Sequence, residues 1–218
     1  MISRTLALFC FVVAALVAIA SSASAFRVFP EDRIVKDTSK LKDWPTTITS
    51  LNVSAYLGRW YQMYADAFVL DTFSNNSFCA TATYGPTVDP VTGHVGVLNW
   101  ERQYSIYGNV RNITGYAYQT EPTQHPGRLS VTLNGAGVNA PYWIFDISPI
   151  SATSGQYEWA IVSDYFKLTL FILARDPETY NRKYDAEVLN ICRARGFTGF
   201  SAPIKVAQSP ACNYNKPR

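Results

Sequence analysis

Short apolar segments recur through most of the chain at a spacing of about ten residues, and turn-forming residues separate them. Eight of these segments predict β-strands, at Trp60–Phe68, Phe78–Tyr84, Val95–Tyr104, Val110–Thr120, Arg128–Leu133, Tyr142–Ile147, Tyr157–Ser163 and Leu168–Ala174. The breaks between them are rich in Asn, Gly and Pro, for example Asn75-Asn76 and Asn134-Gly135. Many short strands at even spacing are typical of a β-sandwich or a β-barrel.

The pattern changes after the eighth segment, where a helix is predicted. Asp176 can serve as the N-cap and Pro177 occupies the first helical position. Apolar side chains then recur at three- and four-residue steps, at Tyr180, Tyr184, Val188 and Ile191. Gly196 supplies a stop signal. An amphipathic helix of this kind is expected to lie against the outside of the sheet.

Residues 1–25 have the features of a secretory signal peptide. A single charge at Arg4 precedes an apolar run from Leu6 to Ala20, and Ala23-Ser24-Ala25 matches an A-x-A cleavage site. The alternative is a membrane anchor, but this run is shorter than the roughly 20 residues that a span needs. No later segment is long and apolar enough. We therefore expect a secreted chain with no integral membrane segment, in which residues 26–50 form an N-terminal extension.

Net charge gives little sign of a polyanionic partner. The chain has 19 Lys and Arg against 16 Asp and Glu, and one of the basic residues, Arg4, lies in the leader. The small remaining excess is scattered along the chain, so it predicts neither nucleic-acid binding nor attraction to an anionic membrane. The length that remains suits one domain with a sizeable core.

The cysteines and the sequons both bear on the compartment. Three cysteines follow the leader, at Cys79, Cys192 and Cys212. An odd number predicts one disulfide with a leftover thiol, or an intermolecular pair. Three N-glycosylation sequons agree with export, and their acceptor residues are Asn52, Asn75 and Asn112.

Motifs for catalysis and metal binding are absent from the sequence. The two histidines, His94 and His125, stand in turn-like segments and form no ligand cluster. Gly-x-Ser-x-Gly, His-Glu-x-x-His and phosphate-binding loops are also missing. The sequence therefore predicts no metal, no cofactor and no enzyme activity of these kinds.

Several motifs, in order along the chain, resemble the signatures of the lipocalin family. Gly58 and Trp60, at the start of the first predicted strand, resemble its Gly-x-Trp motif. Asp164-Tyr165 resembles its Thr-Asp-Tyr turn, with Ser163 in place of Thr. Further segments are similar to strands and the tail of apolipoprotein D and its bacterial relatives: Val97–Asn99, Gly115–Ala117, Ala140–Ile144, Leu170–Arg175 and Gln208–Cys212.

The resemblance implies an all-β fold from residue 51 to residue 212, with a C-terminal tail over residues 213–218. The implied architecture is an eight-stranded, up-and-down antiparallel β-barrel with one C-terminal α-helix packed outside. The resemblance also implies a disulfide between Cys79 and Cys212, which would place Cys192 in the external helix as the free thiol. The competing pair is Cys79–Cys192.

The signature residues have structural roles in this reading. The resemblance implies that Arg175 stacks on the indole of Trp60 at the closed end of the barrel. Gly58, Asp164 and Tyr165 are likewise expected to shape the fold rather than to choose a ligand.

Aromatic residues are numerous, with fourteen Tyr, twelve Phe and five Trp. Inward-facing rings would line an apolar cavity, although many of these rings could instead pack the helix, the tail and the barrel floor. Strict alternation puts Tyr64 on the same face as Trp60, and a glycan on Asn112 would turn the next residue inward. On the sixth strand neither face is marked, and Trp143 and Phe145 are taken as inward without a signal from the residues. The predicted ligand-binding residues are Tyr64, Ile113, Ala117, Trp143 and Phe145.

The sequence favours a non-enzymatic, secreted carrier of a small hydrophobic ligand such as a fatty acid, lysolipid, sterol or pigment. One alternative is an enzyme that uses a thiol inside a lipocalin barrel on a lipid-like substrate. Cys79 is expected in a disulfide and Cys192 on the outer helix, which disfavours that alternative. Another alternative is an interaction protein whose barrel is filled by its own aromatic side chains.

Overall fold

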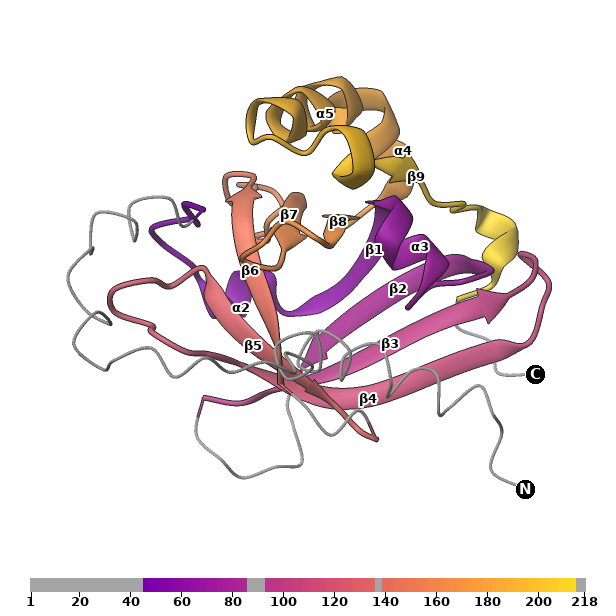
Figure 1. Ribbon diagram of the computed structural model, residues 1–218, viewed down its shortest axis with the longest axis horizontal. Helices are drawn as coiled ribbons and strands as arrows, with labels where there is room; N and C mark the ends of the chain where they lie inside the picture. The colour runs from indigo at the N-terminus through magenta and orange to yellow at the C-terminus, as the bar shows by residue number, and fades with distance from the viewer. Residues whose placement is uncertain (1–44, 86–92, 136–138, 215–218) are drawn as a thin grey trace, which may run out of the picture.

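An antiparallel β-sheet closes on itself to form a barrel, and a helix packs across its outside (Figure 1). The computed structural model describes residues 45–85, 93–135 and 139–214. The strands run in order from β2 to β8, then β1 and β9, and a pairing between β1 and β2 closes the ring. The predicted eight-stranded antiparallel barrel is confirmed, with β9 as an added strand. The bounds are β1 (Gly58–Ala65), β2 (Ser77–Gly85), β3 (Val95–Gln103), β4 (Val110–Gln119), β5 (Arg128–Leu133), β6 (Asn139–Ile147), β7 (Trp159–Ser163), β8 (Leu170–Ala174) and β9 (Ile204–Lys205).

The first strand is shorter than predicted, because a helix begins where the sequence pattern continues the strand to Phe68. β1 ends at Ala65, and Asp66 is the N-cap of α3 (Ala67–Asp71). The Asp66 carboxylate accepts a hydrogen bond from the N–H of Val69 at 2.9 Å, which satisfies one of the helix's free backbone donors. The chain therefore leaves the sheet at the barrel rim and crosses to β2 through a helical turn.

A β-bulge in β1 changes which side chains point into the barrel. One residue separates Gln62 from Tyr64, whereas their partners on β8, Leu173 and Ile172, are adjacent. The extra residue breaks the alternation of side chains along β1. Gln62 lies inside the barrel, while Tyr64 lies outside, where its hydroxyl donates to the Asp185 carboxylate at 2.8 Å.

The predicted C-terminal helix is present and lies over the outer face of the barrel (Figure 1). It begins as α4 (Pro177–Thr179), passes through a π-helical turn (Tyr180–Tyr184) and continues as α5 (Asp185–Ala194). Asp176 is the N-cap, and its carboxylate accepts from the N–H of Thr179 at 2.7 Å. Within the described part of the chain, no helix has both the length and the apolar character needed to cross a membrane.

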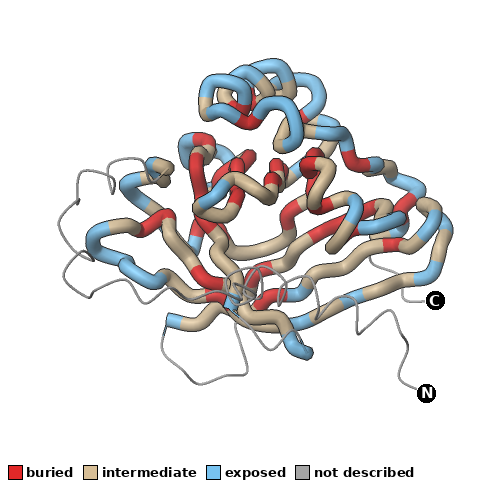
Figure 2. The backbone as a smooth tube through the Cα atoms, in the orientation of Figure 1, coloured by how far each residue is buried: buried red, intermediate tan, exposed pale blue. Residues whose placement is uncertain are grey.

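Buried apolar side chains form three cores, of which the two larger lie under the helix and at the closed end of the barrel. Figure 2 marks the buried residues along the backbone. The core under the helix joins the inner face of the helix to outward-facing side chains of the sheet. Its members include Tyr64, Trp143, Phe145, Ile161, Ile172, Tyr180, Val188, Cys192 and Phe197. The core at the closed end includes Tyr56, Trp60, Tyr84, Val97, Ala117, Ile144, Tyr157 and Leu173.

The closed end is held by Arg175, which follows β8. Its guanidinium carbon lies 3.9 Å from the centre of the Trp60 ring, and the indole N–H donates to the Tyr56 carbonyl at 2.8 Å. The guanidinium donates to four backbone carbonyls, those of Ala55, Tyr56, Arg59 and Tyr157. Gly58 has a φ of +98°, and a Cβ there would lie 3.0 Å from the Arg175 guanidinium, so both conformation and space favour glycine.

A short helix and the described end of the N-terminal extension complete this closed end. α2 (Val53–Tyr56) supplies two of the carbonyls that Arg175 binds, and Ala55 and Tyr56 are buried. The N–H of Ile48 donates to the carbonyl of Ile144 at 3.0 Å. Residues 45–50 therefore lie against the barrel, whereas the predicted leader and residues 26–44 fall outside the described residues.

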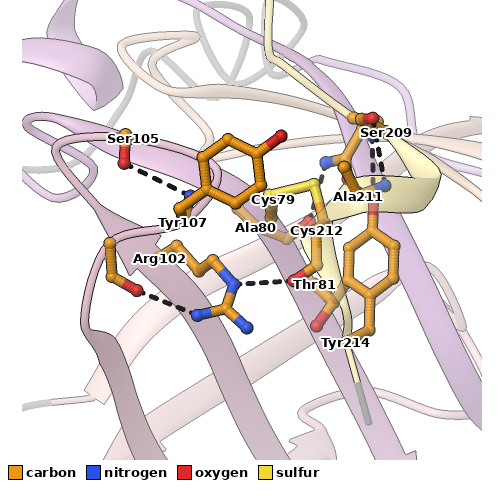
Figure 3. Close-up of a disulfide and its surroundings, with 12 residues drawn as sticks. Cys79, Ala80, Thr81, Arg102, Ser105, Tyr107, Ser209, Ala211, Cys212 and Tyr214 are labelled. Atoms are coloured by element: carbon orange, nitrogen blue, oxygen red, sulfur yellow. Dashed lines mark hydrogen bonds between the residues drawn. A yellow bond between two sulfur atoms is a disulfide. The ribbon is translucent and has the colours of Figure 1, made fainter. Parts of the chain in front are cut away.

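The C-terminal segment returns along β1 to β2, where it is fixed by a disulfide (Figures 1 and 3). Cys79 is joined to Cys212, the pair that the family resemblance implies, with their Cα atoms 5.7 Å apart. The Arg102 guanidinium donates to the Cys212 carbonyl at 2.6 Å, and the Gln208 amide donates to the carbonyls of Gln62 and Ala80. In the chain-entropy description, cross-linking residues so far apart in sequence contributes roughly 4–5 kcal/mol.

We expect Trp60→Ala to lower the free energy of unfolding by about 3–5 kcal/mol, because it leaves a cavity and strips the stacking partner from Arg175. Denaturant unfolding followed by circular dichroism measures the change. Trp100→Ala removes a half-buried ring of β3 that packs on Tyr214, so it is the matched control and should cost less. A loss below about 1 kcal/mol for Trp60→Ala would show that the closed end does not depend on this ring.

Candidate functional site

The barrel contains a cavity of about 820 Å³ that opens at the end opposite Trp60. Its mouth lies among the α3 segment, the β3–β4 turn, the β5–β6 turn and the β7–β8 turn. Aliphatic and aromatic side chains make most of the wall: Ala82, Val97, Ile113, Val131, Leu133, Ala140, Val162, Phe171 and Leu173. Side chains on alternate positions of neighbouring strands thus build one apolar compartment.

The bottom of the cavity carries a cluster of three tyrosine hydroxyls. Tyr84 and Tyr142 line the cavity, and Tyr56 rises from α2 beneath them. The Tyr84 hydroxyl donates to that of Tyr142 at 2.8 Å, and the hydroxyls of Tyr56 and Tyr142 share a hydrogen bond of 2.7 Å. Burial raises the pKa of Tyr84 to about 12 and raises the pKa values of Tyr56 and Tyr142 well above their ordinary value. The cluster is therefore uncharged at neutral pH.

The upper wall carries an ion pair between adjacent strands. Glu101 on β3 and Arg111 on β4 are register partners, and the guanidinium donates to the carboxylate. Arg111 also donates to the carbonyl of Phe73 at 3.1 Å, which ties the α3 segment to the sheet. Burial raises the pKa of Glu101, and the attraction of Arg111 opposes that rise.

The β7–β8 turn at the mouth is organised by Asp164. Its carboxylate accepts from the backbone N–H groups of Phe166, Leu168 and Thr169 and from the Thr169 hydroxyl. The Asp164 carboxylate therefore fixes the conformation of the β7–β8 turn. Phe166, which lines the cavity at this turn, is 67 % exposed.

Comparison with known proteins gives the family. Residues 51–205 match the family model described as a lipocalin-like domain. The chain belongs to the lipocalin family. Temperature-induced lipocalin-1 of Arabidopsis thaliana is 29 % identical over 153 residues, which cover 65 % of this chain and 74 % of that protein.

Solved structures share the fold of this lipocalin. Insecticyanin from the tobacco hornworm Manduca sexta superposes with a TM-score of 0.55 at 16 % identity, covering 78 % of this chain and 88 % of the other. The cockroach allergen Per a 4 gives 0.53 at 19 % identity, over 78 % and 96 % of the two chains. Lobster apocrustacyanin A1 gives 0.51 at 19 % identity, over 79 % and 94 %. The resemblance to apolipoprotein D in particular stays a prediction.

Four of the five predicted ligand-binding residues do not line the cavity, and three of these four lie outside the barrel. Tyr64 was placed inside by strict alternation, and that is wrong because the bulge in β1 turns it toward the helix. Trp143 and Phe145 were placed inside on β6, and that is also wrong. Trp143 packs under the Arg128 guanidinium and beside Tyr165, and Phe145 packs on Phe197 beyond the helix. On β6 the inward residues of the lipocalin are instead Ala140 and Tyr142.

The two predicted residues on β4 both face inward. Ile113 lines the cavity, and its contact with a ligand stays a prediction. Ala117 lies deeper, in the core of the closed end, and does not border the cavity. Between them, a Cβ on Gly115 would lie 2.0 Å from the carbonyl oxygen of Thr132. This glycine therefore serves the close approach of β4 and β5.

The other named residues lie as follows. The three sequon asparagines, Asn52, Asn75 and Asn112, are exposed, and their glycosylation stays a prediction. Asn112 stands at the rim of the cavity, so a glycan there would lie beside the mouth. No cluster of three His, Cys, Asp or Glu side chains suited to a metal occurs among residues 45–85, 93–135 and 139–214.

The sequence analysis missed both polar groups of the cavity, the tyrosine cluster and the Glu101–Arg111 pair. The only signal for the pair was that β3 and β4 are consecutive antiparallel strands, because counting outward from Gly108-Asn109 would set Arg111 opposite Ile106 rather than opposite Glu101. The tyrosine cluster had no such signal. Its members come from α2, β2 and β6, and only closure of the barrel brings them together.

Cys192 is the one free cysteine among the described residues, and its burial predicts that its thiol reacts slowly with thiol reagents. Cys192 lies in α5 within the core under the helix and does not line the cavity. Burial, with the charge of Asp146, raises its pKa to about 12. We expect labelling by a disulfide reagent only after denaturation, with Cys192→Ser as the control for specificity. Rapid stoichiometric labelling of the folded protein would contradict this placement.

The Asp66 carboxylate predicts a pH-dependent stability. Burial raises its pKa from 3.8 to about 6, and the nearby Asp164 adds to the rise. The folded state therefore binds more protons than the unfolded state in this window, and stability is lost as pH rises through it. Asp66→Asn keeps an acceptor for the helix cap and removes the titration. We expect the stability of Asp66→Asn relative to wild type to increase by on the order of 2 kcal/mol as the pH rises from about 3 to about 7.

Denaturant unfolding at a series of pH values checks this expectation. Asp71→Asn removes an exposed carboxylate from the last residue of the same helix and is the matched control. A constant difference between wild type and Asp66→Asn across the range would refute it.

Proposed function

We propose that this lipocalin is a secreted carrier that holds one small hydrophobic molecule in its barrel. The observation that carries the proposal is the cavity of about 820 Å³ with a mainly apolar wall and an open mouth. Sites for small molecules are typically apolar clefts of about 300–1,000 Å³ with a few polar groups. Membership of the lipocalin family supports the same reading.

The energetics allow useful affinity from apolar burial alone. Burying a twelve-carbon chain at ~0.8 kcal/mol per CH₂ yields on the order of 9 kcal/mol before the cost of immobilisation. Micromolar affinity corresponds to about −8 kcal/mol. A chain or ring system of moderate length therefore suffices without a charge pair.

Secretion is part of the proposal and has two supports. The sequence of residues 1–25 has the three regions of a signal peptide. The Cys79–Cys212 disulfide suits an oxidising compartment.

The other two functions considered have less support. An enzyme with a pocket thiol needs a free cysteine in the cavity, and Cys192 lies in the helix outside the barrel. An interaction protein with a filled barrel needs its own side chains to occupy the interior. The aromatic residues Tyr64, Trp143 and Phe145 pack outside instead.

Filling the cavity should abolish binding. Ile113→Trp places a large ring on the inner face of β4, and we expect affinity for a neutral fluorescent probe, N-phenyl-1-naphthylamine, to fall at least tenfold. Tyr116→Trp, on the outer face of the same strand, is the matched control and should bind as wild type does. Absence of saturable binding to wild type, or equal binding to both variants, would reject the carrier function. If the wild type binds the probe, native mass spectrometry of protein from its natural source identifies the molecule that co-purifies with it.

A further inference from the structure

The hydroxyl cluster at the bottom of the cavity has a hydrogen-bond donor to spare. Three hydroxyls supply three protons, and the two hydrogen bonds within the cluster use two of them. Tyr142 stands at the centre and lines the cavity. When Tyr56 donates to Tyr142, the Tyr142 proton is left for an oxygen atom of a ligand that reaches the floor.

The surroundings of this cluster disfavour a negative charge. Burial raises the pKa values of all three tyrosines. For an anion at this place, the lost solvation free energy therefore exceeds the stabilisation by nearby hydrogen bonds and charges. The cation at this end, Arg175, does not line the cavity, and its guanidinium is directed at backbone carbonyls. A neutral hydroxyl or carbonyl oxygen can therefore bind at the floor at lower cost than a carboxylate.

The mouth offers no better place for a carboxylate. Arg111 is the one basic residue among the described residues that line the cavity, and the Glu101 carboxylate already occupies its guanidinium. Asp164, the other acidic residue of the lining, is held by the β7–β8 turn. The charged groups of the described lining thus leave an excess of one negative charge, which repels an anionic head group.

We propose that the barrel selects an uncharged amphiphile whose hydroxyl or carbonyl oxygen binds the Tyr56–Tyr84–Tyr142 cluster, in preference to a fatty-acid anion of the same length. This inference rests on the proposed carrier function and narrows its ligand class. A long-chain alcohol, a sterol and a keto- or hydroxy-pigment are uncharged and carry such an oxygen atom, whereas a free fatty acid is an anion at neutral pH.

The experiment compares 1-dodecanol with dodecanoate, which differ only at the head group, in displacing N-phenyl-1-naphthylamine from the full chain at about pH 7.5. We expect dodecanol to bind at least tenfold more tightly. Tyr142→Phe should remove most of that preference, and Tyr116→Phe on the outer face of β4 should retain it. Thermal unfolding establishes that each variant is folded.

A second variant tests the same inference without touching the tyrosines. Glu101→Gln keeps the shape of the side chain and releases the Arg111 guanidinium from its carboxylate partner. We expect the ratio of dodecanoate affinity to dodecanol affinity to rise at least tenfold. An unchanged ratio would mean that Glu101 does not exclude anions and would overturn that half of the argument.

The outcomes separate this inference from the carrier function. If dodecanoate binds wild type as tightly as dodecanol, the selectivity is refuted while the carrier function stands. If Tyr142→Phe leaves the preference intact, the polar group does not bind at the cluster and the proposal fails. If neither ligand nor the fluorescent probe binds wild type, the carrier function fails as well.

Discussion

The contact between Arg175 and Trp60 is the constraint on which the rest of the barrel depends. It joins the end of β8 to the start of β1, and the hydrogen bonds of Arg175 extend to α2 and to Tyr157, two residues before β7. A guanidinium buried this way is tolerated because backbone carbonyls satisfy its donors and an aromatic face covers it. Burial lowers its pKa to about 10, which leaves it charged at neutral pH.

The floor of the cavity is built on the same contact. The Tyr56 carbonyl accepts hydrogen bonds from the Arg175 guanidinium and the Trp60 indole, and the Tyr56 hydroxyl shares a hydrogen bond with that of Tyr142. The residue that closes the barrel from below therefore also orients the hydroxyl group of Tyr142 at the floor of the cavity. Tyr56 thus connects the signature residues Trp60 and Arg175 to the hydroxyl cluster, although Arg175 and Tyr142 are distant from it in sequence.

Several large aromatic side chains lie on the outer face of the sheet, under the helix. The helix needs a large apolar surface to pack on, and Tyr64, Trp143 and Phe145 provide it. Their place outside leaves smaller side chains, such as Ala82, Val97 and Val131, for the inner wall. The interior keeps its open space because these three rings pack under the helix instead.

The sequence alone predicted the strand segments and the C-terminal helix, and its family motifs implied the barrel order of the strands and the Cys79–Cys212 disulfide. Strand spacing, the Asp176-Pro177 cap and the family motifs are local signals or ordered patterns along the chain. Reading them does not require knowledge of long-range contacts. Short-range alternation was enough to place Ile113 and Ala117 inward, because β4 carries no bulge between them.

Only the tertiary structure decided which residues meet inside the barrel. The bulge in β1 depends on how β1 fits against β8, so alternation from Trp60 gave the wrong face for Tyr64. The inner face of β6 was fixed by the helix, which requires the bulkier Trp143 and Phe145. The tyrosine cluster joins α2, β2 and β6, segments that are distant in sequence, because closing the sheet brings its two edges into register. Sequence patterns report the faces of single elements, and a binding site depends on how those faces are brought together.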